Sequence, residues 1–138
     1  MGSSEEYGPR TSPVEIRETE IPSPISSYGH WKSKLYQNGL FWQHATQQTF
    51  VHLRPFNVLG QGADQNMFVS LLIRHLLKND VFKMTLGEQF RSFLSVKTLI
   101  KTIDALLSQP EHAVALSGQA LNVSDPHYMQ LQEMAQLI

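Results

Sequence analysis

The chain has 138 residues, of which 41% are hydrophobic and 17% charged, and its formal net charge is −1. This length suits one domain with a core of its own. The absence of cysteine excludes disulfides, thiol catalysis and cysteine-ligated zinc, and no apolar run is long enough to predict a membrane span. Because the N-terminus lacks the basic and apolar regions of a secretion signal, we expect a cytoplasmic protein or a domain excised from a longer one.

Charge is distributed unevenly along the chain. Residues 1–30 carry five glutamates against two arginines, residues 31–107 carry nine Lys or Arg against four acids, and residues 108–138 carry three acids and no Lys or Arg. The three segments therefore have net charges of −3, +5 and −3. The near-neutral total hides a basic middle.

The first 28 residues are predicted to form a disordered leader or linker. They hold four of the seven prolines and are rich in Ser, Glu and Gly, a composition that buries too little apolar surface to offset the entropy of ordering. The alternative is a docking peptide anchored by its few apolar residues, which are Val14, Ile16, Ile21 and Ile25.

Helices are expected over most of residues 29–108. A first helix over 31–43 is weakened by Gly39, and a loop follows over 44–64. Residues 65–78 are apolar over most of the helical circumference, which predicts a central, buried helix with Asp64 capping its first turn.

Three further helices complete the expected fold. Thr85 and Glu88 have capping-box spacing and predict a short helix over 86–94. Behind a Ser95 cap, residues 96–107 carry a continuous amphipathic stripe, and a last helix is expected over 125–138 behind a Ser124 cap. The predicted fold class is all-α: a small four-helix bundle in residues 29–108, then a linker and C-terminal helix in residues 109–138.

No catalytic constellation is visible in the sequence. The six histidines include no pair at the i, i+4 spacing of helical metal ligands, and no GxSxG elbow, GxGxxG loop or Walker loop is present. The sequence therefore predicts a protein that is not an enzyme and that holds neither a metal nor a cofactor.

One longer pattern joins the expected loop to the central helix. Phe56-Asn57-Val58-Leu59-Gly60 precedes Gly62-Ala63-Asp64 and the apolar helix. Over residues 31–107 this order resembles the acyl or peptidyl carrier (thiolation) domains of polyketide and nonribosomal peptide synthases. The resemblance implies a four-helix fold and places Asn66, next to Gln65, where those domains carry the Ser that takes a phosphopantetheine arm. Neither side chain has a hydroxyl, so no prosthetic group is expected.

The resemblance implies a non-catalytic docking or protein-interaction module whose partner is a synthase domain or an enzyme. Its partner-binding face is expected to comprise the start of the apolar helix and a basic strip, namely Asp64, Met67, Arg74, Lys78 and Lys83. Two alternatives stay open. One is a basic helical module that binds nucleic acid or another polyanion through the basic middle; the other is a true carrier with an atypical attachment site. No membrane partner is expected.

Overall fold

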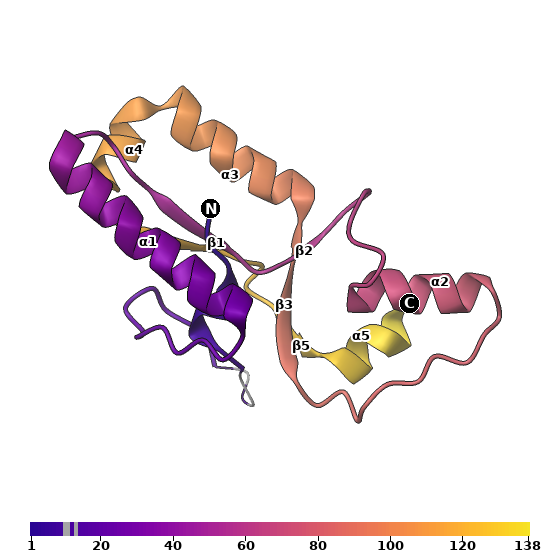
Figure 1. Ribbon diagram of the computed structural model, residues 1–138. Coiled ribbons are helices and arrows are strands. Elements are labelled where there is room, and N and C mark those ends of the chain that lie inside the picture. The colour runs from indigo at the N-terminus through magenta and orange to yellow at the C-terminus, as the bar shows by residue number, and fades with distance from the viewer. Residues whose placement is uncertain (10–11, 13) are drawn as a thin grey trace.

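The computed structural model describes residues 1–9, 12 and 14–138, so residues 10, 11 and 13 of the expected leader lie outside the described part. Strands and helices are interspersed along the chain (Figure 1). The elements are η1 (Ser4–Tyr7), α1 (Ser27–Thr46), β1 (His52–Pro55), β2 (Asn57–Leu59), α2 (Phe68–Leu77), β3 (Phe90–Ser95), α3 (Val96–Ser108), α4 (Pro110–Ala115), β4 (Ala120–Val123), β5 (Tyr128–Gln130) and α5 (Leu131–Leu137).

Parallel strand pairs organise the fold. β1 runs parallel to β4 with His52 opposite Ala120, and β2 runs parallel to β3 with Asn57 opposite Phe93. β5 then pairs antiparallel with the first half of β3. The N–H of Gly2 donates to the carbonyl of Leu53 at 2.6 Å, so the first residues of the chain run beside β1.

The prediction of an all-α four-helix bundle is therefore wrong, because this is a mixed α/β fold. The expected loop over 44–64 contains β1 and β2, and the expected helix over 86–94 overlaps β3 instead. Strands of three to six residues are too short for an alternating pattern to stand out. Their pairing partners also lie far along the chain, as the register of His52 with Ala120 shows.

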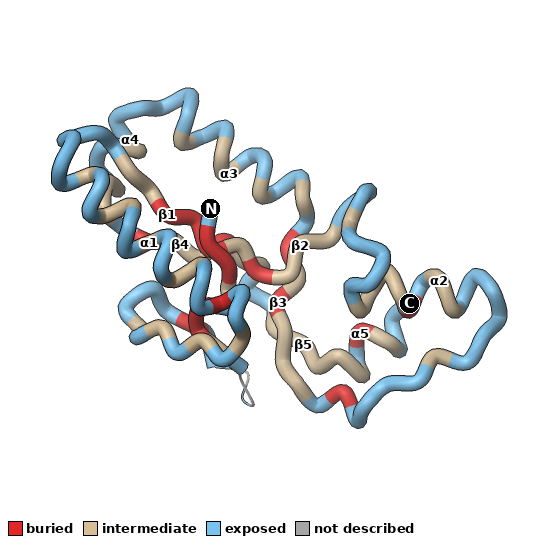
Figure 2. The backbone as a smooth tube through the Cα atoms, viewed as in Figure 1, coloured by how far each residue is buried: buried red, intermediate tan, exposed pale blue. Residues whose placement is uncertain are grey.

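β1 divides the core into two chemically different sides. Leu53 packs with Leu94 and Val123 against residues of α3, whereas His52 and Arg54 contact Glu6 of η1. This follows from the period of a strand, in which successive side chains point to opposite faces. α1 and α3 lie on opposite sides of β1 (Figure 1), and the buried backbone is concentrated around η1, β1 and β3 (Figure 2).

The two helices with the strongest apolar patterns are present. α3 begins at Val96 behind Ser95, whose hydroxyl accepts from the N–H of Lys97 as its cap. α2 lies within the expected range, but it is peripheral rather than central, since Leu72 is its one buried residue. Asp64 does not cap it, because its N-cap is Met67 without a side-chain hydrogen bond.

The two ends of the chain also differ from expectation. The segment expected to be a disordered leader packs through Glu6, Tyr7 and Ile16, all of which are buried, because long-range contacts stabilise what its composition alone does not. Within the expected C-terminal helix, β5 comes first and α5 begins only at Leu131.

Among the described residues, none of the helices combines the length and hydropathy that crossing a membrane requires.

A pair of leucine truncations tests whether β3 lies in the core and α2 at the periphery. Leu94 of β3 is 2% exposed and Leu77 of α2 is 83% exposed. We expect Leu94→Ala to lower the free energy of unfolding by about 2–5 kcal/mol, because it opens a cavity among packed side chains. Leu77→Ala should change it by less than about 0.5 kcal/mol. Urea unfolding followed by far-ultraviolet circular dichroism measures both, and a larger loss for Leu77→Ala would contradict this arrangement.

Candidate functional site

A cleft of about 630 Å³ opens where η1, the start of α1 and the β2–α2 loop converge. Four backbone segments contribute to its wall. The residues that bring polar groups to it include Ser3, Ser4, Glu5, Tyr28, Asn57 and Asp64. Functional groups from distant parts of the sequence therefore share one cavity.

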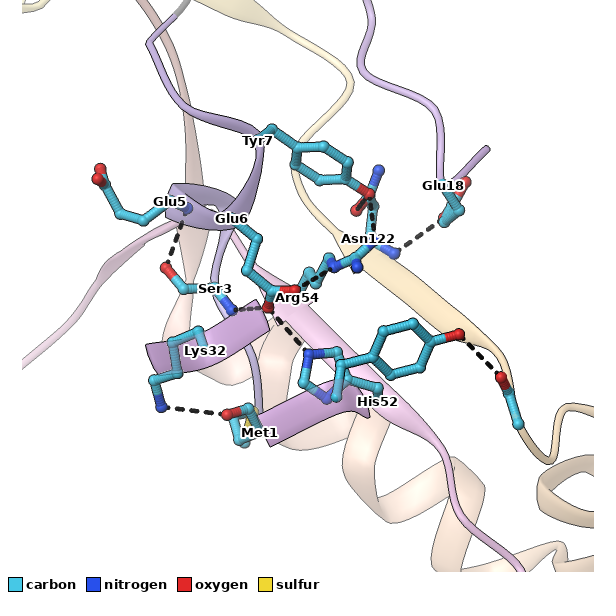
Figure 3. Close-up of polar contacts among 12 residues, drawn as sticks. Met1, Ser3, Glu5, Glu6, Tyr7, Glu18, Lys32, His52, Arg54 and Asn122 are labelled. Carbon is cyan, nitrogen blue, oxygen red and sulfur yellow. Dashed lines mark hydrogen bonds and ion pairs between the residues drawn. The ribbon is translucent and has the colours of Figure 1, made fainter. Parts of the chain in front are cut away.

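The first turn of α1 brings Tyr28 to this cleft, and Lys32 follows in the next turn of the helix. The helix begins behind Ser26, whose hydroxyl accepts from the N–H of Gly29 at 3.0 Å. Tyr28 and Lys32 are one helical turn apart, and the Lys32 ammonium lies 5.3 Å from the centroid of the Tyr28 ring. Lys32 Nζ also donates to the carbonyl of Met1 at 3.1 Å (Figure 3). The phenol at the cleft thus has a cation beside it.

Gly29 allows α1 to approach η1 closely. A Cβ at this position would lie 2.4 Å from the carbonyl oxygen of Glu5, a distance that real side chains do not adopt. The Ser26 hydroxyl adds a contact to the Glu5 carboxylate at 3.4 Å. The absence of a side chain at Gly29 therefore sets the distance between Tyr28 and the Ser3–Glu5 turn.

Glu6 holds the Ser3–Glu5 turn, which is the start of η1 with its N-cap, against β1. Its carboxylate accepts from the N–H of Ser3 at 3.0 Å, and it also binds His52 Nε2 and Arg54 Nε, each at 2.9 Å (Figure 3). Glu6 and His52 are fully buried. Burial alone would raise the pKa of Glu6, but the hydrogen bonds with His52 and Ser3 and the charge of Arg54 together hold it below its usual value.

Tyr7 extends the network to β4. Its hydroxyl accepts from Arg54 Nη1 and donates to Asn122 Oδ1, both at 2.8 Å. Burial raises the pKa of Tyr7, so the hydroxyl keeps its proton at neutral pH and can make both bonds. The turn beside the cleft is therefore tied to two strands of the parallel sheet.

A smaller cavity of about 160 Å³ shares Ser4, Glu5 and Asn57 with the cleft and adds Arg91. The Arg91 side chain is partly buried, with Nη1 donating to the carbonyl of Phe90 at 2.9 Å. A guanidinium at such a place can bind a phosphate or carboxylate group. The two cavities together place the Tyr28 phenol at one end and the Arg91 guanidinium at the other.

Of the site residues that the sequence predicts, some line the cleft and others lie away from it. Asp64 and Met67 line it, whereas the neighbouring Gln65 and Asn66 are exposed and do not line it. Arg74 is partly buried on α2, and Lys78 and Lys83 are exposed beyond it. No observation tests whether these three residues meet a partner, so that role stays a prediction. Arg54, counted in the basic middle, is buried against Glu6 and adds nothing to a surface charge.

Sequence reasoning missed Tyr28 and Lys32. It ended the leader at residue 28 and started the helix after it, although α1 begins at Ser27. The available signal was Ser26 as a helix cap followed by a Tyr and a Lys spaced four residues apart. The buried set of Glu6, His52 and Arg54 had no sequence signal, because it is assembled by long-range packing.

Comparisons with known proteins identify a family and a fold. The family whose sequence model matches residues 1–124 is described as the NAD dependent epimerase/dehydratase family. Among solved structures, a dTDP-glucose 4,6-dehydratase from Bacillus anthracis in complex with NAD is 18% identical, with a TM-score of 0.87 over 98% of this chain and 42% of that one. A UDP-glucuronic acid 4-epimerase from Bacillus cereus, in complex with UDP-glucuronic acid and NAD, is 22% identical, with a TM-score of 0.84 over 99% and 43%.

A third structure, RMD from Pseudomonas aeruginosa complexed with NADPH, is 23% identical, with a TM-score of 0.80 over 99% of this chain and 46% of that one. At such identities the likeness establishes the fold. This chain spans less than half the length of each of these three structures.

These matches overturn the carrier-domain resemblance and what it implied. The family match makes the chain part of a catalytic family, so the predictions of a docking module and of a non-enzyme are wrong. With a different fold and family, Gln65 and Asn66 are not substitutes for an attachment serine. The resemblance failed because carrier domains share only the local order of loop and apolar helix with this chain.

Gly29 provides a test of the contact between α1 and η1. A Gly→Ala change inside a helix ordinarily stabilises by up to about 1 kcal/mol, but here the added Cβ meets the Glu5 carbonyl. We expect Gly29→Ala to lower the free energy of unfolding by about 1–3 kcal/mol. Asn38→Ala, at an exposed position of the same helix, should not destabilise. Thermal unfolding of the two variants decides, and stabilisation by Gly29→Ala would refute the contact.

The Glu6 cluster predicts a pH-dependent contribution to stability. The pKa of Glu6 is lowered from 4.5 in the folded state, so its stabilisation is complete above that value and is lost as the pH falls through the folded pKa. Glu6→Gln leaves Arg54 buried without its counter-ion, and should cost about 3–5 kcal/mol at neutral pH. The difference from the unsubstituted protein should shrink as the pH falls below 4.5.

Urea unfolding at a series of pH values measures this difference. Glu88→Gln, at an exposed position, is the control and should stay within about 0.5 kcal/mol of the unsubstituted protein. A difference between Glu6→Gln and the unsubstituted protein that is independent of pH would show that the Glu6 charge does not stabilise the fold.

Proposed function

This chain belongs to the NAD dependent epimerase/dehydratase family, and on that premise we propose that it forms the proton-transferring, substrate-facing part of an enzyme acting on a nucleotide-linked sugar. The observation that carries the proposal is the meeting of Tyr28, with Lys32 beside it, and the Ser3–Glu5 turn on one cleft. Nucleotide sugars are named for the similar structures from Bacillus anthracis and Bacillus cereus, which supports this substrate class.

Tyr28 is the proposed proton-transferring group. Epimerisation at a sugar carbon, or loss of water from it, requires a proton to move at a hydroxyl. A tyrosine oxygen within hydrogen-bonding reach can accept this proton as the phenolate and give it back as the phenol. The Lys32 ammonium lies 5.3 Å from the centroid of the Tyr28 ring and so places a positive charge next to the proposed proton-transferring group.

The opposite wall of the cleft supplies groups of complementary kinds. Ser4 brings a hydroxyl and Glu5 a carboxylate to the cavity that Tyr28 also lines. A hydroxyl can hold the substrate oxygen in place, and a carboxylate can transfer a second proton, as loss of water demands. Arg91 in the adjoining cavity suits the diphosphate of a nucleotide sugar, because a guanidinium binds phosphate through two parallel hydrogen bonds.

The residues present do not form a dinucleotide cradle. Such a cradle places glycines in a tight turn between a strand and a helix, so that backbone N–H groups reach the pyrophosphate. The glycine-bearing loop between β2 and α2 is different: α2 begins only at Phe68, and a Cβ on Gly62 would meet nothing within 4 Å. The roles proposed for this chain are therefore substrate binding and proton transfer.

Binding of a nucleotide sugar tests the substrate class. UDP-glucose titrated into the ¹⁵N-labelled chain should shift the amide signals of Ser4, Tyr28 and Arg91. Arg91→Ala should weaken binding by about ten- to a hundredfold, because it removes a charge-assisted contact. Lys97→Ala, an exposed cation on α3, should leave the affinity unchanged. Saturable shifts confined to other surfaces would contradict the proposal.

Substitution at Tyr28 tests the proton-transfer role. The whole protein is assayed with dTDP-glucose or UDP-glucuronic acid and NAD, and the products are separated by chromatography. Tyr28→Phe should reduce turnover by about 10²–10⁴ while UDP-glucose affinity changes little. Lys32→Met should reduce turnover as well, whereas Lys34→Met, two residues along and exposed, should not. Full turnover with Phe at position 28 would assign proton transfer to another group.

A further inference from the structure

Glu6 has no place in the chemistry proposed above, yet it is the charged group most completely enclosed beneath the cleft. Its side chain is 0% exposed, while Glu5 next to it is exposed and lines the cavity. A buried carboxylate is costly unless it is paired and hydrogen-bonded. The contacts that offset this cost are therefore informative about what Glu6 does.

The two carboxylate oxygens of Glu6 have different partners. Oε1 accepts from the N–H of Ser3 at 3.0 Å and from His52 Nε2 at 2.9 Å. Oε2 accepts from Arg54 Nε at 2.9 Å. One oxygen thus bridges the cleft-lining turn to β1, and the other neutralises the only guanidinium buried in the described part of the chain.

The groups around Glu6 come from three elements. His52 and Arg54 lie on β1, and Tyr7 on η1 binds Arg54. Tyr36 of α1 packs against His52 with ring centroids 4.8 Å apart and lies 5.3 Å from the Arg54 guanidinium. The buried Tyr7 and the partly buried Tyr36 exclude water, which strengthens the electrostatic interactions among these groups. Nδ1 of His52 is buried and has no hydrogen-bond partner among the described residues, so Glu6 is the group that holds this imidazole.

The turn itself depends on these bonds. Ser3 Oγ accepts from the N–H of Glu5 at 3.2 Å, and with the Glu6 bond to the Ser3 N–H it forms a capping box. η1 is only four residues long, too short to be stable without tertiary contacts. The Ser3–Glu5 backbone is therefore placed by Glu6 and its partners on β1, together with the bond from Gly2 to Leu53.

We propose that Glu6 is a positioning residue: its ionised carboxylate, held by His52 and Arg54, sets the Ser3–Glu5 turn in the conformation that binds ligand in the cleft. Loss of the charge releases the N–H of Ser3 and frees Arg54, and the turn moves while the sheet stays formed. The identity of the ligand rests on the proposed function, but the placement of the turn does not.

The test compares two buried polar groups of the same network. Glu6→Gln keeps the shape of the side chain but puts an amide donor against either His52 or Arg54. Tyr7→Phe removes the hydroxyl that binds Arg54 and Asn122 and leaves the bond to Ser3 in place. Both variants lose stability. Only Glu6→Gln should accelerate hydrogen exchange of the Ser3 and Glu5 amides, by about tenfold or more, and weaken UDP-glucose binding by a similar factor.

A titration of the unsubstituted chain supplies a second measurement that needs no variant to fold. The carboxyl ¹³C signal of Glu6 and the amide ¹H signal of Ser3 are followed as the pH is lowered. Coincident midpoints are expected, because protonation weakens the bond between them. A Ser3 signal that does not follow the carboxyl, or a Tyr7→Phe variant with equally rapid exchange at Ser3 and Glu5, overturns the proposal.

The two proposals fail separately. If the unsubstituted chain does not bind UDP-glucose, the substrate class is wrong, and the amide exchange and the titration still decide the role of Glu6. If UDP-glucose binds equally well to Glu6→Gln and to the unsubstituted chain, the proposed function survives and the positioning role does not.

Discussion

A single buried carboxylate connects β1 of this protein to its candidate site. Glu6 is fully enclosed, and its charge is compatible with that position because His52, Arg54 and the Ser3 N–H all bind it. Glu6 and His52 are 46 residues apart in sequence. Their contact places a short, intrinsically weak turn against a strand that forms only when β4 pairs with it. The site therefore exists only in the assembled fold.

A steric constraint complements this electrostatic one. Glu6 places η1 on β1, and Gly29 lets α1 come within contact of the Glu5 carbonyl. With both distances set, Tyr28 on α1 lines the same cleft as the Ser3–Glu5 turn, and the Lys32 ammonium lies over the Tyr28 ring. Neither Glu6 nor Gly29 is itself proposed to transfer a proton. The chemistry proposed for the cleft thus depends on a buried charge and a missing side chain outside the reacting groups.

The carrier-domain resemblance shows how local order can mislead. The apolar helix after a glycine-bearing loop and the amphipathic stripe after Ser95 are real, since α2 and α3 lie where the pattern places them. The difference lies in the strand that precedes the loop. β2 pairs in parallel with β3, so the chain forms a strand pair where the resemblance implied a helical bundle. The helical pattern is shared by both folds and cannot distinguish them.

The sequence by itself determined α2 and α3, whose apolar residues extend over ten or more positions, and the cap at Ser95, because these features depend on neighbours within one or two turns. It also contained the spacing of Tyr28 and Lys32, but it did not show that Tyr28 lines a cleft with the Ser3–Glu5 turn. Only the tertiary structure decided the strands, the ordering of the first residues and the Glu6 cluster. Strands of three to six residues carry little signal of their own, and a buried ion cluster is stable only when distant segments enclose it.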